Sequence, residues 1–247
     1  MSLEFIKPDW PLADKVNVVT TTRAGGNSAA PYNKLNLGIH VGDDERVVKN
    51  NRSLISNFLD LPSEPKWLKQ IHSDLVVEAS AIESDVVQAD ASFTTDRHIV
   101  CAVLTADCLP VVFSDANGDC IAVAHAGWKG LLNGILQKTI QAMMSYSKPE
   151  FAWLGPAIGP SAFEVGDNVY QPYVQQNEKF KNAFTTKGNA KWSLDIYQAA
   201  EVVLRSQDLT NIYGGTYCTL SEKDRFYSYR RDGVTGRMAT LAWKSQK

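Results

Sequence analysis

The 247-residue chain is predicted to fold as a mixed-sheet α+β or α/β domain. Short runs of β-branched and aromatic residues, which are typical of strands, occur along the whole chain. Longer segments with apolar residues at helical spacing lie among them, but the two kinds of segment do not alternate strictly. Strict alternation characterises doubly wound folds, so the sequence favours a mixed sheet over a Rossmann-type fold.

Seven runs predict strands, and they span residues 16–22, 74–80, 98–106, 109–115, 120–126, 151–155 and 226–231. Helical spacing predicts helices within residues 43–62, 126–145 and 193–207, the first with an Asp at its start and a Pro at its end. Two Gly/Pro-rich segments, 26–38 and 155–168, are expected to be ordered loops. No repeat, low-complexity stretch or long linker divides the chain.

The charge and composition of the chain argue against several classes of partner. The net charge is −2 and no block of Lys and Arg occurs, so neither a nucleic acid nor an anionic membrane surface is expected as the main partner. No apolar run approaches the ~20 residues of a membrane span, and the start of the chain lacks an export signal. The four cysteines include no CxxC pair and are expected to be reduced thiols. These features predict a cytoplasmic protein.

The stretch "VVFSDANGDCIAVAHA" (111–126) predicts a β-hairpin, because Asn117-Gly118 is a favoured pair for a type I′ turn. In that register Cys108 lies opposite residue 127, and His125 lies diagonally from Cys108 on the same face. Diagonal Cβ atoms are about 7–8 Å apart or less, so a thiolate and an imidazole could meet at one zinc ion. Pro110 could introduce a bulge or end the pairing.

Three interpretations of Cys108 follow: a packed core thiol, a nucleophile, or half of a metal site with His125. A catalytic zinc needs a third ligand. His72 stands at the entry to a predicted strand, but His40 and His98 are equally open on composition. The segment after His125 is predicted to begin a helix, whose N-terminus would favour an anion.

Six motifs then occur in a distinctive order: "TTRAGG…PYNKLNLG" (21–38), "WLKQIHS" (67–73), "ADCLPV" (106–111), "HAGWKG" (125–130), "GPAIGPSAFEVG" (155–166) and "FYSYRRDGVTGRMA" (226–239). In these motifs the chain resembles the YfiH family, whose members are also known as laccase-domain proteins, polyphenol oxidases or peptidoglycan editing factor. The resemblance implies one α+β domain over residues 1–247, with layered mixed sheets flanked by helices. The fold would be similar to that of the cytotoxic necrotizing factor.

The resemblance also implies a zinc site. Matched by motif, His72, Cys108 and His125 would bind the metal and carry the catalysis. Family activity implies phosphorolysis of adenosine, inosine, guanosine and S-methyl-5′-thioadenosine, together with deamination of adenosine. The partners would then be a purine nucleoside and phosphate. Lys129 stands where the family commonly has Arg, which would weaken a bidentate phosphate contact there.

Arg23, Gln70 and Arg230 are the candidate substrate-binding residues. Arg23 is followed by Gly25-Gly26, and Arg230 lies in "YSYRRDG", so either arginine could hold phosphate. An ordinary structural or solvated ion pair is an equal expectation for both.

Two alternatives remain. Cys108 and His125 could form a metal-free cysteine hydrolase that removes L-serine from a muramoyl cell-wall precursor, as the editing-factor name implies. A copper laccase is rejected as the main activity, because four histidines cannot ligate a multi-copper cluster. Adventitious copper at the same ligands would give weak oxidase turnover. The sequence leaves open whether the protein is a monomer or a homodimer.

Overall fold

The computed structural model describes residues 2–84 and 86–245 and shows a single α+β domain with three sheets. The predicted fold class is confirmed. The proposed domain span of 1–247 includes Met1, Asp85 and residues 246–247, which lie outside the described residues. Across the described ranges, no helix combines the length and the apolar character that a membrane span requires.

Two large sheets form the centre of the molecule. The four-stranded sheet is antiparallel and has the order β1 (Phe5–Ile6), β2 (Val16–Thr21), β13 (Met238–Lys244) and β5 (Cys101–Thr105). The six-stranded sheet has the order β12 (Asn211–Gly214), β8 (Phe151–Leu154), β6 (Leu109–Ser114), β7 (Ile121–Ala126), β4 (Ala91–Thr94) and β3 (Val76–Glu78). It is mixed, because the β12–β8 and β3–β4 pairs are parallel and the others antiparallel.

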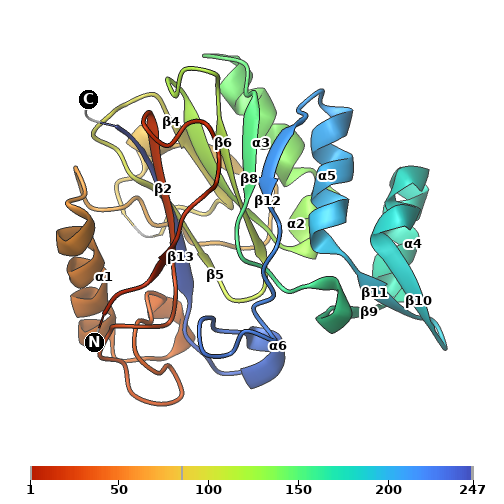
Figure 1. Cartoon of the computed structure of the whole chain (residues 1–247), viewed down its shortest axis with the longest axis horizontal. Coiled ribbons are helices and arrows are strands. Elements are labelled where there is room, and N and C mark those ends of the chain that lie inside the picture. The colour runs from red at the N-terminus through yellow and green to blue at the C-terminus, as the bar shows by residue number, and fades with distance from the viewer. Residues whose placement is uncertain (1, 85, 246–247) are drawn as a thin grey trace.

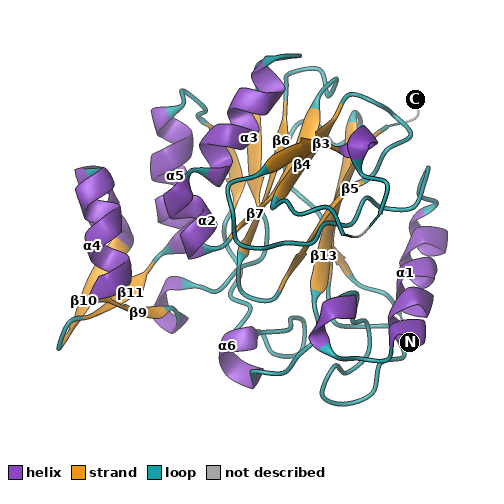
Figure 2. Ribbon diagram, turned by 180° about the vertical axis from the view of Figure 1, so that it is seen from behind, coloured by secondary structure: helices purple, strands orange, loops and turns teal. Residues whose placement is uncertain are grey.

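Helices cover the outer faces of these sheets (Figures 1 and 2). The α-helices are α1 (Glu45–Leu59), α2 (Trp128–Asn133), α3 (Ile135–Met144), α4 (Asp167–Gln176), α5 (Ile196–Ser206) and α6 (Tyr229–Asp232). Short 3₁₀ turns are η1 (Ile39–Val41), η2 (Ala79–Ala81), η3 (Pro160–Ala162) and η4 (Glu178–Ala183). A small antiparallel sheet of β10 (Phe184–Gly188), β11 (Lys191–Leu194) and β9 (Glu164–Gly166) lies with α4 at one end of the molecule.

Strands β6 and β7 are apolar at nearly every position because each of their two faces packs into a different core cluster. Val112 and Val123 pack between the two large sheets, in a cluster that includes Val103 of β5. Their neighbours Val111 and Ala124 point the other way, into a cluster with residues of α3 and α5. Both faces of these strands are therefore buried, as a continuous apolar run requires. The outer face of the four-stranded sheet packs in a third cluster that includes a residue of α1.

The predicted hairpin register is confirmed, since Leu109 pairs with Ala126 and Pro110 with His125. Pro110 causes no bulge there; its carbonyl accepts a hydrogen bond from Gly155, on the side of β8. The predicted type I′ turn is wrong. That turn needs positive φ at two central residues, but Gly118 has φ +74° and Asn117 does not share the left-handed region.

Instead, the Asp115 side chain holds the turn, because its carboxylate accepts hydrogen bonds from the backbone N–H groups of Asp119 and Cys120.

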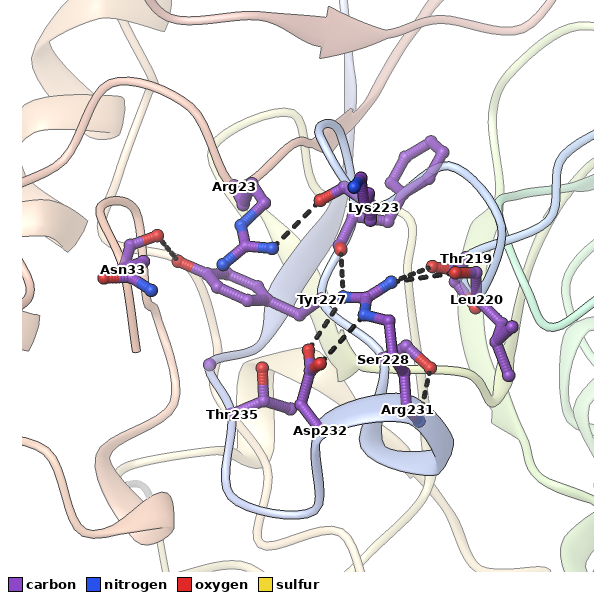
Figure 3. A network of polar contacts seen from close by, with 12 residues as sticks. Arg23, Asn33, Thr219, Leu220, Lys223, Tyr227, Ser228, Arg231, Asp232 and Thr235 are labelled. Carbon is purple, nitrogen blue, oxygen red and sulfur yellow. Dashed lines mark hydrogen bonds and ion pairs between the residues drawn. The ribbon is translucent and has the colours of Figure 1, made fainter. Parts of the chain in front are cut away.

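Two further predictions need correction. The single helix expected in 126–145 is divided into α2 and α3 by Gly134, whose φ of +97° ends one helix and begins the next. The strand expected at 226–231 is a loop followed by α6. There the guanidinium of Arg231 donates to the carbonyls of Thr219, Leu220 and Phe226, which curls the chain around this side chain (Figure 3). The same side chain forms an ion pair with Asp232.

Candidate metal centre

Three loops or strand ends bring His72, Cys108 and His125 together. Cys108 directly precedes β6, His125 is near the end of β7, and His72 lies in the loop before β3. The Sγ atom of Cys108 is 3.7 Å from Nε2 of His72, and all three potential ligand atoms lie within 4.8 Å of one another. Within the described part of the chain this is the one group of three or more side chains with that arrangement.

The other two histidines do not belong to this group. His40 of η1 lines the same cavity but contributes no atom to the cluster. His98 is exposed in the turn after β4, where its backbone N–H donates to Asp96. The structure therefore selects His72 from the three candidates that composition left open.

Asp90, which the sequence analysis did not single out, organises two of the three side chains. Its fully buried carboxylate accepts hydrogen bonds from Nδ1 of His125, at 2.8 Å, and from the backbone N–H groups of Ile71, His72 and Ser73. With Nδ1 engaged, His125 presents Nε2 to the cluster. The backbone contacts also hold His72 at its positive φ of 57°. No local pattern revealed this role, because the partners lie 17 to 35 positions away.

The electrostatics favour a charged pair in the absence of a metal. Burial raises the pKa of the Cys108 thiol, but the positive charge and hydrogen bond of His125, followed by the interactions with His72, lower it to about 6. Burial lowers the pKa of His125, yet the Cys108 thiolate and Asp90 raise it to about 9. Burial likewise raises the pKa of Asp90, and hydrogen bonds from His125 and Ser73 lower it to about 2. These shifts favour the thiolate form of Cys108, the form that binds a metal or acts as a nucleophile.

The chain passes close to the cluster at Gly127, where a side chain would be crowded. A Cβ atom there would lie 3.0 Å from Sγ of Cys108 and 3.0 Å from Cδ2 of His72, closer than side chains normally come. This position opposite Cys108 is the one that the hairpin register predicted. α2 starts immediately afterwards, but the exposed Lys129 of that helix does not line the cavity. Lys129, which stands where the family commonly has Arg, is therefore not part of the cavity wall.

A second buried carboxylate, that of Asp107, connects the cluster to the C-terminal part of the chain. It accepts hydrogen bonds from the hydroxyls of Thr219 and Ser228 and from the backbone N–H of Arg230, at 2.6, 3.0 and 2.7 Å. Asp107 itself has φ +97°, an uncommon conformation for a residue other than glycine. Since it directly precedes Cys108, it joins a ligand to the segment that bears Arg230.

The cluster opens into a cavity of about 480 Å³. That volume is in the range of small-molecule sites in proteins. Apolar and aromatic side chains form much of its wall, among them Leu104, Trp128, Ile158, Phe163 and Ile196. Polar side chains complete it on the side of the ligands and of the C-terminal segment.

Two of the three predicted substrate-binding residues line the cavity. Gln70 lines the cavity, but its side-chain amide exchanges two hydrogen bonds with the backbone of Leu104. Arg230 lines it as well, and donates to the carbonyl of Glu164. Arg23 does not reach the cavity: it donates to the carbonyl of Lys223 and lies 4.9 Å from the ring centre of Tyr227 (Figure 3). Sequence reasoning missed Tyr229 and Arg237 in the wall.

Comparisons with known proteins agree with this architecture. A purine nucleoside phosphorylase of Haemophilus influenzae is 43% identical over 243 residues, covering 98% of this chain and 99% of that protein. Purine nucleoside phosphorylase YfiH of Escherichia coli K12 is 43% identical over 240 residues, with 97% and 98% covered.

Solved structures give the same result. A Neisseria meningitidis protein, NMB0706 of family DUF152, superposes with a TM-score of 0.92 at 44% identity, covering 98% of this chain and 99% of that one. YlmD from Geobacillus stearothermophilus has a TM-score of 0.90 at 26% identity, covering 98% and 96%. The family model described as "Multi-copper polyphenol oxidoreductase laccase" matches residues 17–245. The chain therefore belongs to this laccase-like family, the one that includes the YfiH proteins its motifs resemble.

Proposed function

We propose that this protein is a zinc-dependent purine nucleoside phosphorylase that also deaminates adenosine. Its substrates would be adenosine, inosine, guanosine and S-methyl-5′-thioadenosine, each cleaved by phosphate to the free base and a ribose or methylthioribose 1-phosphate. The observation that carries the proposal is a His₂Cys cluster that opens into a cavity of small-molecule size. The relatives named purine nucleoside phosphorylases support the choice of substrate.

The three side chains fit zinc. Zinc–sulfur and zinc–nitrogen bonds of about 2.3 and 2.0–2.1 Å at a tetrahedral angle place the two ligand atoms about 3.6 Å apart. The separation of Cys108 Sγ from His72 Nε2 is 3.7 Å. His72, Cys108 and His125 would hold the metal, and zinc, when bound, would supply a Lewis acid beside the cavity.

The chain's own residues supply orientation and shelter. Asp90 fixes the tautomer of His125 and holds the backbone of His72, so both imidazoles are positioned before substrate arrives. Trp128 and Phe163 supply aromatic surface in the wall, a kind of surface that suits a planar purine base.

A laccase reaction is not proposed. Reduction of dioxygen to water uses several copper ions, whereas the described residues offer one cluster of three ligands and the chain has four histidines in all. Copper at this cluster would give weak, adventitious oxidase activity.

The test is product analysis with adenosine and phosphate. We expect adenine and ribose 1-phosphate, with some inosine from deamination. Leaving out phosphate should suppress adenine and spare inosine, and removal of the metal by chelation should suppress both products until zinc is restored. If zinc-replete protein converts none of the four nucleosides, the proposal is wrong.

One observation favours a second candidate, a cysteine amidase acting on a muramoyl precursor. Cys108, His125 and Asp90 have the order of a nucleophile, a base and an orienting carboxylate, with a 2.8 Å bond between His125 and Asp90. In that case the metal-free protein would release L-serine from the precursor, and alkylation of Cys108 would abolish the reaction.

We also propose a cytoplasmic protein with small-molecule partners, no nucleic acid or membrane partner, and a monomeric or homodimeric state. The four cysteines are free thiols, which supports a reducing compartment. Cell fractionation and light scattering during gel filtration test the location and the oligomeric state.

A further inference from the structure

We propose that Arg237 and Arg230 form the phosphate subsite of this cavity, in place of Arg23. The inference rests on the proposed function and adds the residues that would receive its second substrate. Both arginines belong to the C-terminal segment and both line the cavity that contains the metal ligands.

Arg230 and Arg237 differ from neighbouring arginines in their charge partners. Other arginines nearby have carboxylate partners: Arg225 pairs with Glu4 and Glu222, and Arg231 pairs with Asp232. For Arg230 and Arg237, none of the described carboxylates lies within ion-pair distance. The cavity wall therefore carries two guanidinium groups without a direct counter-charge, an arrangement that favours an anionic ligand.

Both guanidinium groups also have hydrogen-bond donors that no described residue uses. Arg237 donates from Nη1 to the carbonyls of Thr235 and Gly236, and no described residue accepts from its Nε or Nη2. Arg230 likewise uses Nη1, toward the carbonyl of Glu164, and its remaining donors have no acceptor among the described residues. A tetrahedral oxyanion can accept such donors in pairs, which a lysine cannot provide.

Hydrogen bonds hold the backbone that carries these two side chains in place. The N–H of Arg230 donates to Asp107, and the N–H of Arg237 donates to Asn36. Arg231 holds α6 through its carbonyl contacts and its ion pair (Figure 3). The carboxylate of Asp107 also lines the cavity, but its oxygens already accept three hydrogen bonds and so do not occupy the arginines.

The surroundings support an anion at this place. Arg237 is partly buried; burial lowers its pKa, the nearby negative charges of Cys108 and Asp107 act in the opposite direction, and the guanidinium stays charged at neutral pH. Burial, followed by Arg237 and Arg52, lowers the pKa of His40 in the same cavity, so this imidazole is neutral. A neutral His40 adds a hydrogen-bonding group without adding charge.

In the proposed phosphorolysis, one bond to C1′ of the ribose replaces another. An oxygen of hydrogen phosphate forms a bond to C1′ of the ribose while the bond from C1′ to N9 breaks. The electron pair of that bond stays on the purine, which takes up the proton that the phosphate loses. The two arginines neutralise part of the phosphate charge as it approaches the sugar.

The experiment compares Arg237→Gln and Arg230→Gln with wild type and with Arg205→Gln as the matched control. Arg205 is exposed on α5 and pairs with Glu201, so it loses the same charge far from this wall. At saturating inosine, we expect the KM for phosphate to rise about tenfold or more in the first two variants, because each loses a charge-assisted hydrogen bond. The KM for inosine and the zinc content should stay within twofold of wild type, as in the control.

Two additions keep the result independent of catalysis and of folding. Calorimetric titration of the zinc-loaded protein with inorganic phosphate alone should show binding that Arg237→Gln weakens. Arg237→Lys, which retains the charge, should recover part of the affinity, and thermal melting should identify any variant that fails to fold.

An unchanged phosphate KM in both Gln variants would overturn the subsite, as would a larger effect of Arg23→Gln. If the wild type cleaves no nucleoside but the Gln variants lose phosphate binding, the proposed reaction fails and the subsite stands.

Discussion

The two sides of the cavity are built differently. On the ligand side, His125 is buried and Asp90 is fully buried. Nδ1 of His125 and the carboxylate of Asp90 are hydrogen-bonded to each other. On the C-terminal side, Arg230 is exposed and the Tyr229 side chain is 61% exposed. The Asp107 carboxylate holds this side by accepting hydrogen bonds from the hydroxyl of Ser228 and the backbone N–H of Arg230. These contacts do not use the guanidinium of Arg230. Asp90 thus holds the backbone of the exposed His72 and the ring of the buried His125 in place, while the opposite wall retains donors for a ligand.

Removal of a metal ligand should produce the largest effect. Wild-type protein purified without added metal is expected to hold near-stoichiometric zinc, and Cys108→Ala and His72→Ala should lose most of it together with activity. His98→Ala is the control, since His98 lies outside the cluster. Elemental analysis provides the measurement, and full zinc retention by both ligand variants would point to other ligands.

Asp90→Asn should have the next largest effect. The amide cannot accept every hydrogen bond that the carboxylate receives, so His125 and the loop of His72 lose their fixed orientation. Loss of such a supporting partner typically lowers metal affinity by about 10- to 100-fold. A competition titration with a zinc chelator measures this change, and an unchanged zinc affinity would show that the ligand side does not depend on Asp90.

Acid should weaken the same side. The pKa of Asp90 is lowered to about 2 from an ordinary value of 3.8, so its stabilising effect is complete above the unfolded value and is lost as pH falls from about 4 to 2. The shift corresponds to about 2 kcal/mol in the free energy of unfolding of metal-free protein. Urea titrations should show that the advantage of wild type over Asp90→Asn shrinks across this range. A constant difference between pH 5 and pH 2 would contradict the assignment.

Alkylation separates the metal centre from the cysteine hydrolase. Zinc should shield the Cys108 thiolate, so iodoacetamide should label it about tenfold more slowly in the zinc-loaded protein than after chelation. Peptide mapping by mass spectrometry distinguishes Cys108 from the partly exposed Cys218. Rapid labelling of zinc-loaded protein in step with loss of activity would favour the amidase.

The smallest effect is expected on the C-terminal side, at Tyr229. Because its side chain is mostly exposed, Tyr229→Ala should leave the melting temperature unchanged and raise the KM for the nucleoside about two- to threefold. Steady-state kinetics and calorimetry test both statements. A large drop in melting temperature would show that this wall is as rigid as the ligand side.

Local patterns account for much of the fold. The central strands β5 to β8 and helix α1 appear near their predicted places, because apolar periodicity and end signals act over a few residues. The division at Gly134 and the helix α6 were missed. In the second case the decisive contacts are made by Arg231 with carbonyls of a loop that precedes it.

Sequence by itself determined that Cys108 lies opposite residue 127 and on the same side as His125, and the family motifs singled out His72 as the third member of the cluster. Side-chain alternation along paired strands has a period of two, so a turn sets every pair that follows. Tertiary structure alone decided which polar groups remain available. Arg23 and Arg237 are the same residue type, and the sequence does not show which of them faces the cavity. In the folded chain Arg23 donates to the carbonyl of Lys223, whereas Arg237 lines the cavity wall. The same long-range packing brings Asp90 to His125, since hydrogen-bond partners far apart in sequence meet only when the sheets assemble.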